Sequence, residues 1–296
     1  MIPTLSEWNK REKVRLLTLL AVFLIGAISW LPQISLGSSF TTKCYCLQVS
    51  FLNIGQGDSI FIETPDGYQA LVDGGPDMSV LRELGHEMSF FDRSIDMIVA
   101  SHPDADHISG LTDVLTRYDV ATVIETTNGK ETLVTKNLAT AVENEQAQVI
   151  NPEAGQVIML GASTTLRFLA PTGDGTNWES NMASIIIRVE YGSTSVMLTG
   201  DAPIEIEKYV VGAYPNFLKS NVLKLGHHGS KTSSSNEFLD AVHPEYAVVS
   251  AGLNNKYGHP HQSVMQAVTA RNIKVDETSK EGTITFYSDG KTVWKK

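Results

Sequence analysis

Short apolar runs separated by turn residues fill the region that follows residue 46. Residues 46–75 contain three such runs, separated by Gly or Asp-Gly, and this pattern predicts three strands. Asp66-Gly67 lies at the tip of a predicted hairpin turn in the segment TPDGY. Further hairpins are predicted over 155–171, 182–201 and 282–296.

Helical periodicity alternates with strands along the rest of the chain. Helices are predicted over 80–85, 108–118, 132–147, 204–213, 235–241 and 262–271. Apolar runs at 94–101 and 120–126 predict buried strands. Clustered strands with helices between them indicate an α/β protein with two mixed sheets and helices on their outer faces. No Pro/Gly-rich linker divides residues 47–296, so we predict a single domain there.

The N-terminal segment has a different pattern. The basic stretch NKREKVR precedes the uncharged run LLTLLAVFLIGAISWL, and 18 residues from Val14 to Leu31 are at the short end for a membrane span. Basic residues before the run predict a cytoplasmic N-terminus and an exported remainder. We therefore expect one transmembrane helix within residues 1–35, followed by a linker over 36–46. A signal peptide cleaved within SLGSS, which would yield a secreted protein, is the alternative.

Composition and charge narrow the possible functions. The chain has 23 basic and 33 acidic residues, a net charge of −10. Such a surface repels polyanions at long range, which argues against a general nucleic-acid coat. It does not exclude a nuclease, because metal ions in a cleft reverse the local field.

Cysteine usage gives a weaker indication. Cys44 and Cys46 are the chain's two cysteines, and two thiols cannot build a zinc site alone. We expect them to be free thiols beside the linker. A disulfide formed in an oxidising compartment is the alternative.

Polar side chains gather directly after several predicted strands. HPDADH, residues 102–107, follows one strand, and Asp73, Asp201 and the pair His227-His228 follow others. A lone Asp at such a place is usually a helix N-cap or a turn residue. Four acids and imidazoles within six residues would be costly at a buried strand end without a cation. This cluster therefore predicts a metal site.

These motifs resemble those of a known family. HPDADH resembles the HxHxDH signature of the metallo-β-lactamase superfamily, with Asp104 at the place of the second His. Together with FLNIGQGDSIFIETPDGYQALVDGG, SIIIRVEYGSTSVMLTGD, LKLGHHGSKTSSS, YGHPH and EGTITFYSDGK, it resembles the hydrolase domain of ComEC competence proteins over nearly all of residues 47–296. The resemblance implies an αββα metallo-β-lactamase sandwich. In place of a multi-span channel and an oligonucleotide-binding region, we expect a standalone hydrolase domain with one anchor.

The resemblance also implies a centre with two divalent metal ions. Carried over by position, the metal ligands are His102, Asp104, Asp106, His107, Asp201 and His227. His102 and Asp104 would bind one ion, Asp106 and His107 the other, and Asp201 both. Either His227 or His228 completes the set, and we favour His227. Because Asp104 replaces a His, this site is expected to favour Mn or Mg over a purely zinc centre. For the two bound ions together, we expect Zn or Mn.

We also predict catalytic, substrate-binding and supporting roles for residues around these ligands. Asp106, His228 and His259 are predicted to be catalytic, with His228 facing the substrate and His259 lining the cleft. Ser230 and Lys231 are predicted to bind substrate phosphate. Asp58, Asp73 and Asn181 are predicted to support the ligands.

The expected function depends on this centre. Two divalent ions activate water and neutralise charge on phosphorus, so we expect a membrane-anchored, extracytoplasmic phosphodiesterase or nuclease acting on DNA, with a separate DNA-uptake channel as a partner. One alternative is a hydrolase of phosphorylcholine-type or other small esters, which the acidic composition favours slightly. Another is a catalytically inactive accessory or binding protein in DNA uptake.

Overall fold

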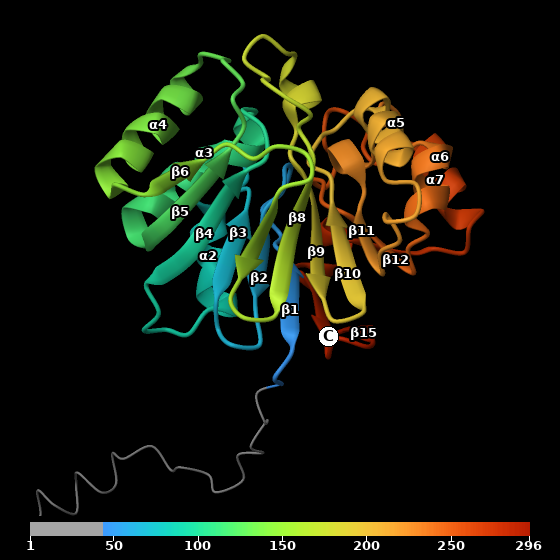
Figure 1. Ribbon diagram of the computed structural model, residues 1–296, viewed down its shortest axis with the longest axis horizontal. Coiled ribbons are helices and arrows are strands. Elements are labelled where there is room, and N and C mark those ends of the chain that lie inside the picture. Colours follow the sequence, from blue (N-terminus) through green and yellow to red (C-terminus); the bar gives the residue numbers. More distant parts are fainter. Residues whose placement is uncertain (1–43) are drawn as a thin grey trace, which may run out of the picture. The chain divides into compact units, whose positions relative to one another are not determined.

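The computed structural model describes residues 44–296, of which Tyr45–Lys296 form one compact unit (Figure 1). The predicted transmembrane helix within 1–35 lies outside the described residues, as does most of the predicted linker. Within residues 44–296, no helix is both long enough and apolar enough to cross a membrane.

The first sheet has eight strands, which are antiparallel on one side of the sheet and parallel on the other. Its order is β15 (Val293–Lys295), β14 (Ile284–Ser288), β1 (Leu47–Phe51), β2 (Ile60–Glu63), β3 (Gln69–Val72), β4 (Ser94–Ala100), β5 (Asp119–Glu125) and β6 (Gln148–Ile150). Strands β3 to β6 run parallel, and β1 pairs antiparallel with both β2 and β14.

The second sheet has seven strands and the same division. Its order is β13 (Lys274–Glu277), β12 (Tyr246–Val249), β11 (Val222–Lys224), β10 (Thr194–Leu198), β9 (Ile186–Tyr191), β8 (Thr164–Ala170) and β7 (Val157–Leu160). Strands β10 to β13 run parallel, which places the segments after β10, β11 and β12 at one edge of the sheet.

Helices cover both outer faces. One face of the first sheet packs against α2 (Ser79–Glu87), α3 (Ala105–Arg117) and α4 (Leu133–Glu145). The second sheet packs against α5 (Ile204–Ala213), α6 (Asn236–Val242) and α7 (Gln262–Thr269). The short helices η1 (Ser180–Ala183), η2 (Gly226–Gly229) and α8 (Thr278–Glu281) lie in connections.

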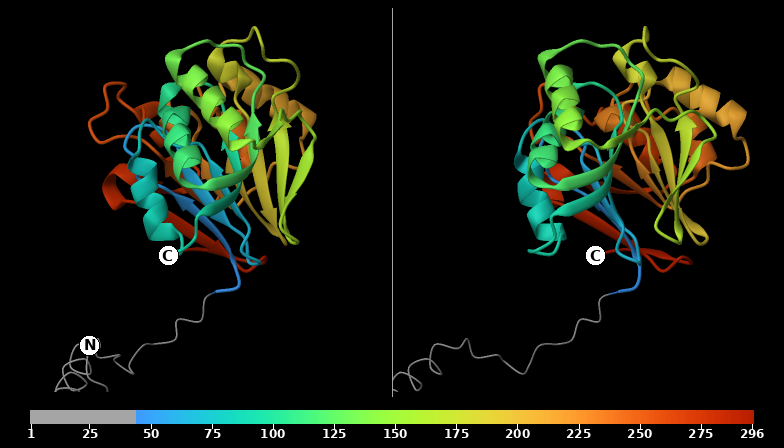
Figure 2. Two further views of the ribbon diagram at one scale, coloured as in Figure 1. Left: turned by 90° about the vertical axis from the view of Figure 1, so that its left-hand side faces the viewer. Right: turned by 60° about the vertical axis from the view of Figure 1, so that its left-hand side comes forward.

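Apolar side chains from the facing sides of the two sheets form a third, central core. Phe51 and Phe286 on the first sheet and Phe168 on the second are among its fully buried members. The sheets therefore lie face to face between the helical layers, as Figure 2 shows. The predicted αββα sandwich is confirmed.

Two glycines let the connections approach closely enough to build a site. A Cβ on Gly110 of α3 would lie 2.1 Å from the carbonyl oxygen of Gly74, so α3 packs directly on the turn after β3. A Cβ on Gly57 would lie 1.9 Å from the carbonyl oxygen of Asp106. Both contacts bring the loops of the first sheet against the N-terminus of α3.

The two cysteines differ from the expectation. Cys44 and Cys46 are disulfide-bonded, so the predicted free thiols are wrong and the alternative holds. Because the two residues are separated only by Tyr45, the bond closes a very small loop at the start of the compact unit.

A buried ion pair connects the two sheets. Lys224 of β11 is fully buried, and its Nζ lies 2.8 Å from Oδ2 of Asp58, in the connection between β1 and β2. The ammonium also donates to the carbonyl of Leu225 at 3.0 Å. Burial raises the pKa of Asp58, but Lys224 and His228 lower it more strongly, so it lies well below its ordinary value.

Replacing Lys224 by Met should destabilise the protein strongly. The methionine fills similar space but leaves the Asp58 carboxylate buried without its cation, and loss of one partner of a buried pair costs about 3–5 kcal/mol. Urea unfolding followed by circular dichroism measures the change. Lys274→Met, at an exposed ion pair with Glu245, is the matched control and should change the midpoint little. Equal midpoints for the two variants would contradict the role given to Lys224.

Candidate metal centre

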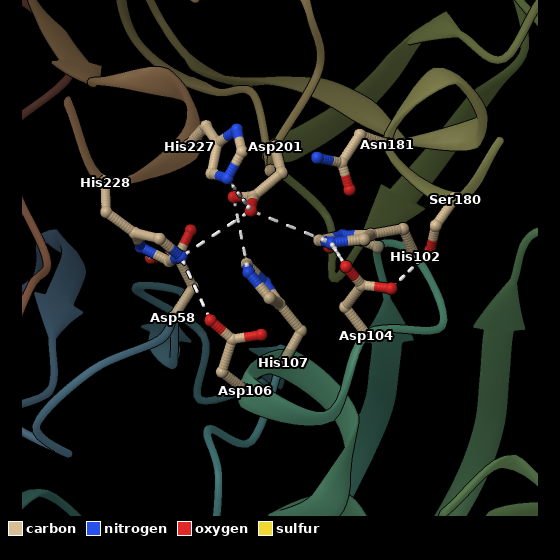
Figure 3. Close-up of polar contacts among 12 residues, drawn as sticks. Asp58, His102, Asp104, Asp106, His107, Ser180, Asn181, Asp201, His227 and His228 are labelled. Carbon is tan, nitrogen blue, oxygen red and sulfur yellow. Dashed lines mark hydrogen bonds and ion pairs between the residues drawn. The ribbon is translucent and has the colours of Figure 1, made fainter. Parts of the chain in front are cut away.

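The polar residues that the sequence singles out lie at the ends of strands from both sheets. The first sheet contributes Asp73 after β3 and the segment 102–107, which runs from the loop after β4 into the first turn of α3. The second contributes Asp201 after β10 and the two histidines of η2, which comes after β11. Figure 3 shows the side chains of segment 102–107 and those of Asp201, His227 and His228 gathered around a common centre.

Asp201 occupies the middle of the cluster. Its Oδ1 lies 3.3 Å from Nε2 of His107. Its Oδ2 lies 3.6 Å from Nε2 of His228, 3.5 Å from that of His227 and 3.9 Å from that of His102. The two oxygens of one carboxylate thus face imidazoles from both sheets, which is the arrangement expected of an acid that bridges two ions.

Several of these buried atoms have no hydrogen-bond partner within the described chain. They are Nε2 of His102, His107 and His228 and Oδ1 of Asp201. Potential ligand atoms of Asp58, His107, Asp201 and His228 all lie within 4.8 Å of one another. Buried polar groups without partners are costly, and imidazole nitrogens with carboxylate oxygens are the ligands that Zn and Mn use. The donor set therefore fits divalent cations.

The Nδ1 atoms of His102, His107 and His228 make hydrogen bonds, and their Nε2 atoms do not. His107 Nδ1 donates to Asp73 Oδ2 at 2.8 Å, and His228 Nδ1 donates to the carbonyl of Ser250 at 2.8 Å. The Ser101 hydroxyl donates to Asp73 and so accepts from His102 Nδ1 at 3.0 Å. In each ring the proton on Nδ1 is fixed by its hydrogen bond, so Nε2 is the nitrogen that faces the centre and could bind a cation.

Asp73 and Asp58, for which a supporting role is predicted, contact the candidate ligands. Asp73 holds His107 directly and His102 through Ser101. The φ of Asp73 is 60°, a left-handed conformation that Asp tolerates better than most residues. Asp58 Oδ1 lies 3.3 Å from His228 Nδ1 while Oδ2 pairs with Lys224.

The buried carboxylates of the cluster favour positive charge on the groups around them. Burial lowers the pKa of His228, but Asp201 and Asp58 raise it more, to about 9. Burial likewise lowers the pKa of His107, but Asp201 and Asp73 hold it well above its ordinary value. Burial and the neighbouring His107 lower the pKa of His102 to about 4. Without metal, protons on the first two rings balance the carboxylates, and cations would displace them.

Asp104 and Asp106 flank the centre and are more exposed. Asp106 Oδ2 lies 3.4 Å from Nε2 of His228. Asp104 Oδ2 lies 3.8 Å from Nε2 of His102, while its Oδ1 bonds the ammonium of Lys130 at 2.5 Å and the hydroxyl of Ser180. Burial raises the pKa of Asp104, but the hydrogen bonds from Lys130 and Ser180 lower it below its ordinary value.

The structure reverses the expected arrangement of the histidine pair. His228 is 1% exposed and belongs to the buried group of four, whereas the side chain of His227 is 27% exposed and its Nδ1 lies 3.1 Å from the Thr232 hydroxyl. The geometry favours His228 as the ligand, not as the substrate-facing group. Both residues have positive φ, 48° and 57°, and this left-handed turn directs the second ring inward.

His259 lies beside the cluster. Its ring centroid is 5.4 Å from that of His227 and 6.1 Å from that of His228, and its Nδ1 is buried without a partner. Burial and the two neighbouring rings lower its pKa to about 4.

The predicted phosphate contacts differ from one another. Ser230 is only 4% exposed, and its hydroxyl accepts from Thr232 at 2.9 Å, which disagrees with a substrate contact. Lys231 is exposed, and its backbone N–H donates to His261. Asn181 lies in η1 at the edge of the cluster, where its Oδ1 is buried without a partner (Figure 3).

Sequence reasoning missed five groups that hold the site. They are Ser101, Lys130, Ser180, Lys224 and Ser250. Ser101 is adjacent to the HPDADH motif and could have been found from that position. The other four come from distant segments and carry no local signal.

Comparisons with known proteins agree with this geometry. Residues 52–146 match the model of the Metallo-beta-lactamase superfamily. The structure of the metallo-beta-lactamase fold protein YhfI from Bacillus subtilis covers 83% of this chain and 99% of that protein, with a TM-score of 0.53 at 13% identity. The chain thus carries a metallo-β-lactamase domain with a candidate metal site.

The chain also has relatives that are similar to it in sequence. The chain is 30% identical to ComE operon protein 3 of Bacillus subtilis (strain 168) over 256 residues, which cover 81% of this chain and 33% of that protein. It is 44% identical to Competence protein ComA of Neisseria gonorrhoeae over 119 residues, 40% of this chain and 17% of that protein. The predicted resemblance to ComEC-like competence proteins is confirmed, and the matches span a third or less of these relatives' length.

Replacing Asp201 by Ala should lower the metal content of the purified protein. The change removes the carboxylate that faces all four imidazoles, so we expect up to two divalent ions in the parent and fewer in the variant. Elemental analysis after dialysis measures the count. Asp119→Ala, at an exposed carboxylate of β5, is the control and should retain the parent's metal. Unchanged metal in Asp201→Ala would refute its bridging position.

Metal binding should release protons at neutral pH. The pKa of His228, about 9 without metal, lies above the ordinary value, so the ring is protonated at pH 7 and must lose its proton to become a ligand. Apparent affinity should therefore rise with pH between 6 and 8, by about tenfold per unit for each displaced proton. Calorimetry in two buffers of different ionisation enthalpy counts these protons.

The matched variants for this measurement are His228→Ala and His259→Ala. The first should lower the proton count by about one. The second should leave it unchanged, because the pKa of His259 is about 4 and its ring is neutral at pH 7. Proton release that is equal in all three proteins would show that His228 is not a ligand.

Proposed function

We propose that this protein is an extracytoplasmic, membrane-anchored, metal-dependent phosphodiesterase that hydrolyses DNA. The observation that carries the proposal is the cluster around Asp201, where buried imidazole and carboxylate atoms without partners face one another. Similarity to competence proteins supports DNA as the substrate class.

The proposed ligands divide between two ions. His102 and Asp104 would hold one ion, and the other would be held by His107, Asp106 and His228. Asp201 faces both groups and would bridge them. Bound divalent ions, Zn or Mn, would supply a Lewis acid for the phosphodiester and a water of lowered pKa.

Residues around these ligands perform the other tasks. Lys130 compensates part of the negative charge that Asp104 brings to the centre, because its ammonium bonds that carboxylate directly. His259 has a neutral ring with an unpaired Nδ1 beside the centre and is the proposed group that moves a proton at the phosphate ester. Exposed Lys231 is the proposed contact to a non-bridging phosphate oxygen.

Two features support a location outside the cytoplasm. Basic residues precede the apolar run of the N-terminal segment, which favours export of the chain beyond that run. The disulfide between Cys44 and Cys46 is typical of oxidising compartments. A DNA-uptake channel that delivers a strand to the site is the proposed partner.

A small phosphodiester is the second candidate substrate. The net charge of −10 favours it, since long-range repulsion weakens association with a polyanion but hardly affects a small ester.

The proposal predicts turnover by the full-length protein loaded with Mn. Bis-p-nitrophenyl phosphate and DNA should both be hydrolysed, and chelation should abolish both activities. His259→Ala should lower kcat by roughly 10²–10⁴-fold, the usual contribution of a general acid or base, with metal content intact. Hydrolysis of phosphorylcholine esters but not DNA would select the second candidate. A metal-loaded protein that hydrolyses none of these would be a binding or accessory protein.

A further inference from the structure

Two consecutive phenylalanines protrude from the loop between α2 and β4. Phe90 and Phe91 are 77% and 87% exposed, and neither belongs to one of the three apolar cores. Their rings meet edge to face with centroids 5.1 Å apart, and the guanidinium carbon of Arg93 lies 5.9 Å from the Phe90 centroid. A single exposed apolar side chain is ordinary, whereas adjacent exposed aromatic rings are typical of a surface that binds a membrane or a partner.

Hydrogen bonds hold this loop in a defined turn. Asp92 Oδ2 accepts from the side-chain amide of Gln69 at 2.9 Å. Asp92 Oδ1 accepts from the backbone N–H and the hydroxyl of Ser94 at 3.2 and 3.1 Å. The backbone N–H of Asp92 donates to the carbonyl of Ser89 at 2.9 Å, which closes the turn. The exposure of the two rings at its tip is therefore a property of the folded chain.

The loop lies at the end of the molecule where the compact unit begins. Parallel strands β3 and β4 both start at this edge, and antiparallel pairing places the start of β1 and the hairpin between β2 and β3 beside them. Exposed Tyr45 and Tyr68 add two further rings there, and we call these two residues with Phe90 and Phe91 the aromatic edge. Figure 1 shows the loop between α2 and β4 and the start of β1 at the same end of the compact unit.

The candidate metal centre lies at the other end of the same strands. Asp73 follows the end of β3, and His102 follows the end of β4. Strand β4 has seven residues, which span about 20 Å. A surface that contacts the aromatic edge would therefore leave the metal centre facing away from it.

The sequence before the compact unit favours a lipid surface as the occupant of this edge. The apolar run Val14–Leu31, the proposed membrane anchor, is separated from Cys44 by the 12 residues 32–43. Twelve residues reach at most about 40 Å when fully extended. Because the compact unit starts at the aromatic edge, a bilayer that holds the apolar run lies within reach of that edge.

Charges in the turns of this edge nearly cancel. The turns 64–68, 88–93 and 289–292 carry three carboxylates and two cations, which are Asp66, Asp92, Asp289, Arg93 and Lys291. An edge without excess positive charge is not attracted to anionic lipid. Contact with a bilayer would therefore depend on burial of the rings and would be insensitive to salt.

We propose that the aromatic edge docks on the membrane surface, with the rings of Phe90 and Phe91 at the boundary between lipid headgroups and acyl chains. Aromatic side chains are favoured at this depth. The inference rests on the proposed membrane anchor and adds the orientation of the domain. The metal centre then faces the aqueous side, so the substrate reaches it from water and is not a lipid of the same bilayer.

A single fluorescent label tests docking in the full-length, Mn-loaded protein reconstituted in phosphatidylcholine vesicles. Cys44 and Cys46 are bonded to each other, so Ser89→Cys supplies one reactive thiol for the environment-sensitive dye NBD. Docking should shift the emission to shorter wavelength, and nitroxide-labelled lipid should quench it at low and high salt alike. Leu253→Cys, at an exposed position in the loop after β12, is the matched control and should emit as in water without quenching.

Substitution of the two rings separates docking from other effects on the label. In the Ser89→Cys protein, the double change Phe90→Ser and Phe91→Ser should lower the docking equilibrium roughly tenfold for each ring removed. Phe90→Leu with Phe91→Leu keeps apolar side chains and should retain the quenching. Turnover of bis-p-nitrophenyl phosphate should be unchanged in both, because the loop lies at the far end of β4 from the metal centre. Thermal unfolding verifies that each variant is folded.

Anchoring and docking have separate readouts. Retention on the vesicles after alkaline washing reports the anchor, and lipid quenching at position 89 reports docking. Retained protein without quenching keeps the anchor and overturns docking, whereas quenching of a protein that the wash removes supports docking and rejects the anchor. A protein with neither signal rejects both. Blue-shifted emission that lipid does not quench would show that a protein surface covers the loop, and it would also overturn the proposal.

Discussion

The buried carboxylate of Asp201 is the constraint around which the rest of the structure is arranged. It follows strand β10 of the second sheet, yet its Oδ1 faces His107, an imidazole carried by the first sheet. The histidines around it leave Nε2 atoms buried without hydrogen bonds, a costly arrangement unless a cation occupies the space between them. Packing the two sheets face to face brings these groups together, and the three apolar cores hold them there.

Support for this cluster comes from a second layer of polar contacts. Asp73 fixes His107 and, through Ser101, His102. On the other side, the Asp58–Lys224 pair and the carbonyl of Ser250 hold His228. Because these partners occupy the Nδ1 atoms, the Nε2 atoms remain available to a metal ion. The close contacts at Gly57 and Gly110 allow the loops that carry these residues to approach one another.

The two sides of the centre differ in charge. On the side of Asp104, a lysine bonds one carboxylate oxygen, whereas the side of Asp106 has a histidine whose own pKa is raised. A carboxylate at position 104 adds negative charge that a histidine would not, and Lys130 compensates part of it. The same lysine lines two cavities, so the residue that balances the ligand charge also faces the space available to a substrate.

Local sequence patterns suffice to predict the elements and most of the candidate ligands. The spacing of apolar residues and the positions of turn residues predict the helix Ile204–Ala213 and the strand before HPDADH. Both signals depend only on residues that are close in the chain. The density of acids and imidazoles in HPDADH likewise predicts a cation from local chemistry alone. The supporting roles predicted for Asp73 and Asp58 agree with their contacts to the histidines.

How these residues face one another depends on the tertiary structure. Periodicity does not reveal that His227 and His228 both adopt positive φ, and this turn buries the second ring where the first was expected. Lys130 and Lys224 reach Asp104 and Asp58 from distant segments, and no pattern near either lysine encodes that contact. The bond between Cys44 and Cys46 also depends on the conformation of the backbone between them. Local patterns report the conformation of a segment, whereas ligand direction and charge compensation depend on which segments the fold brings together.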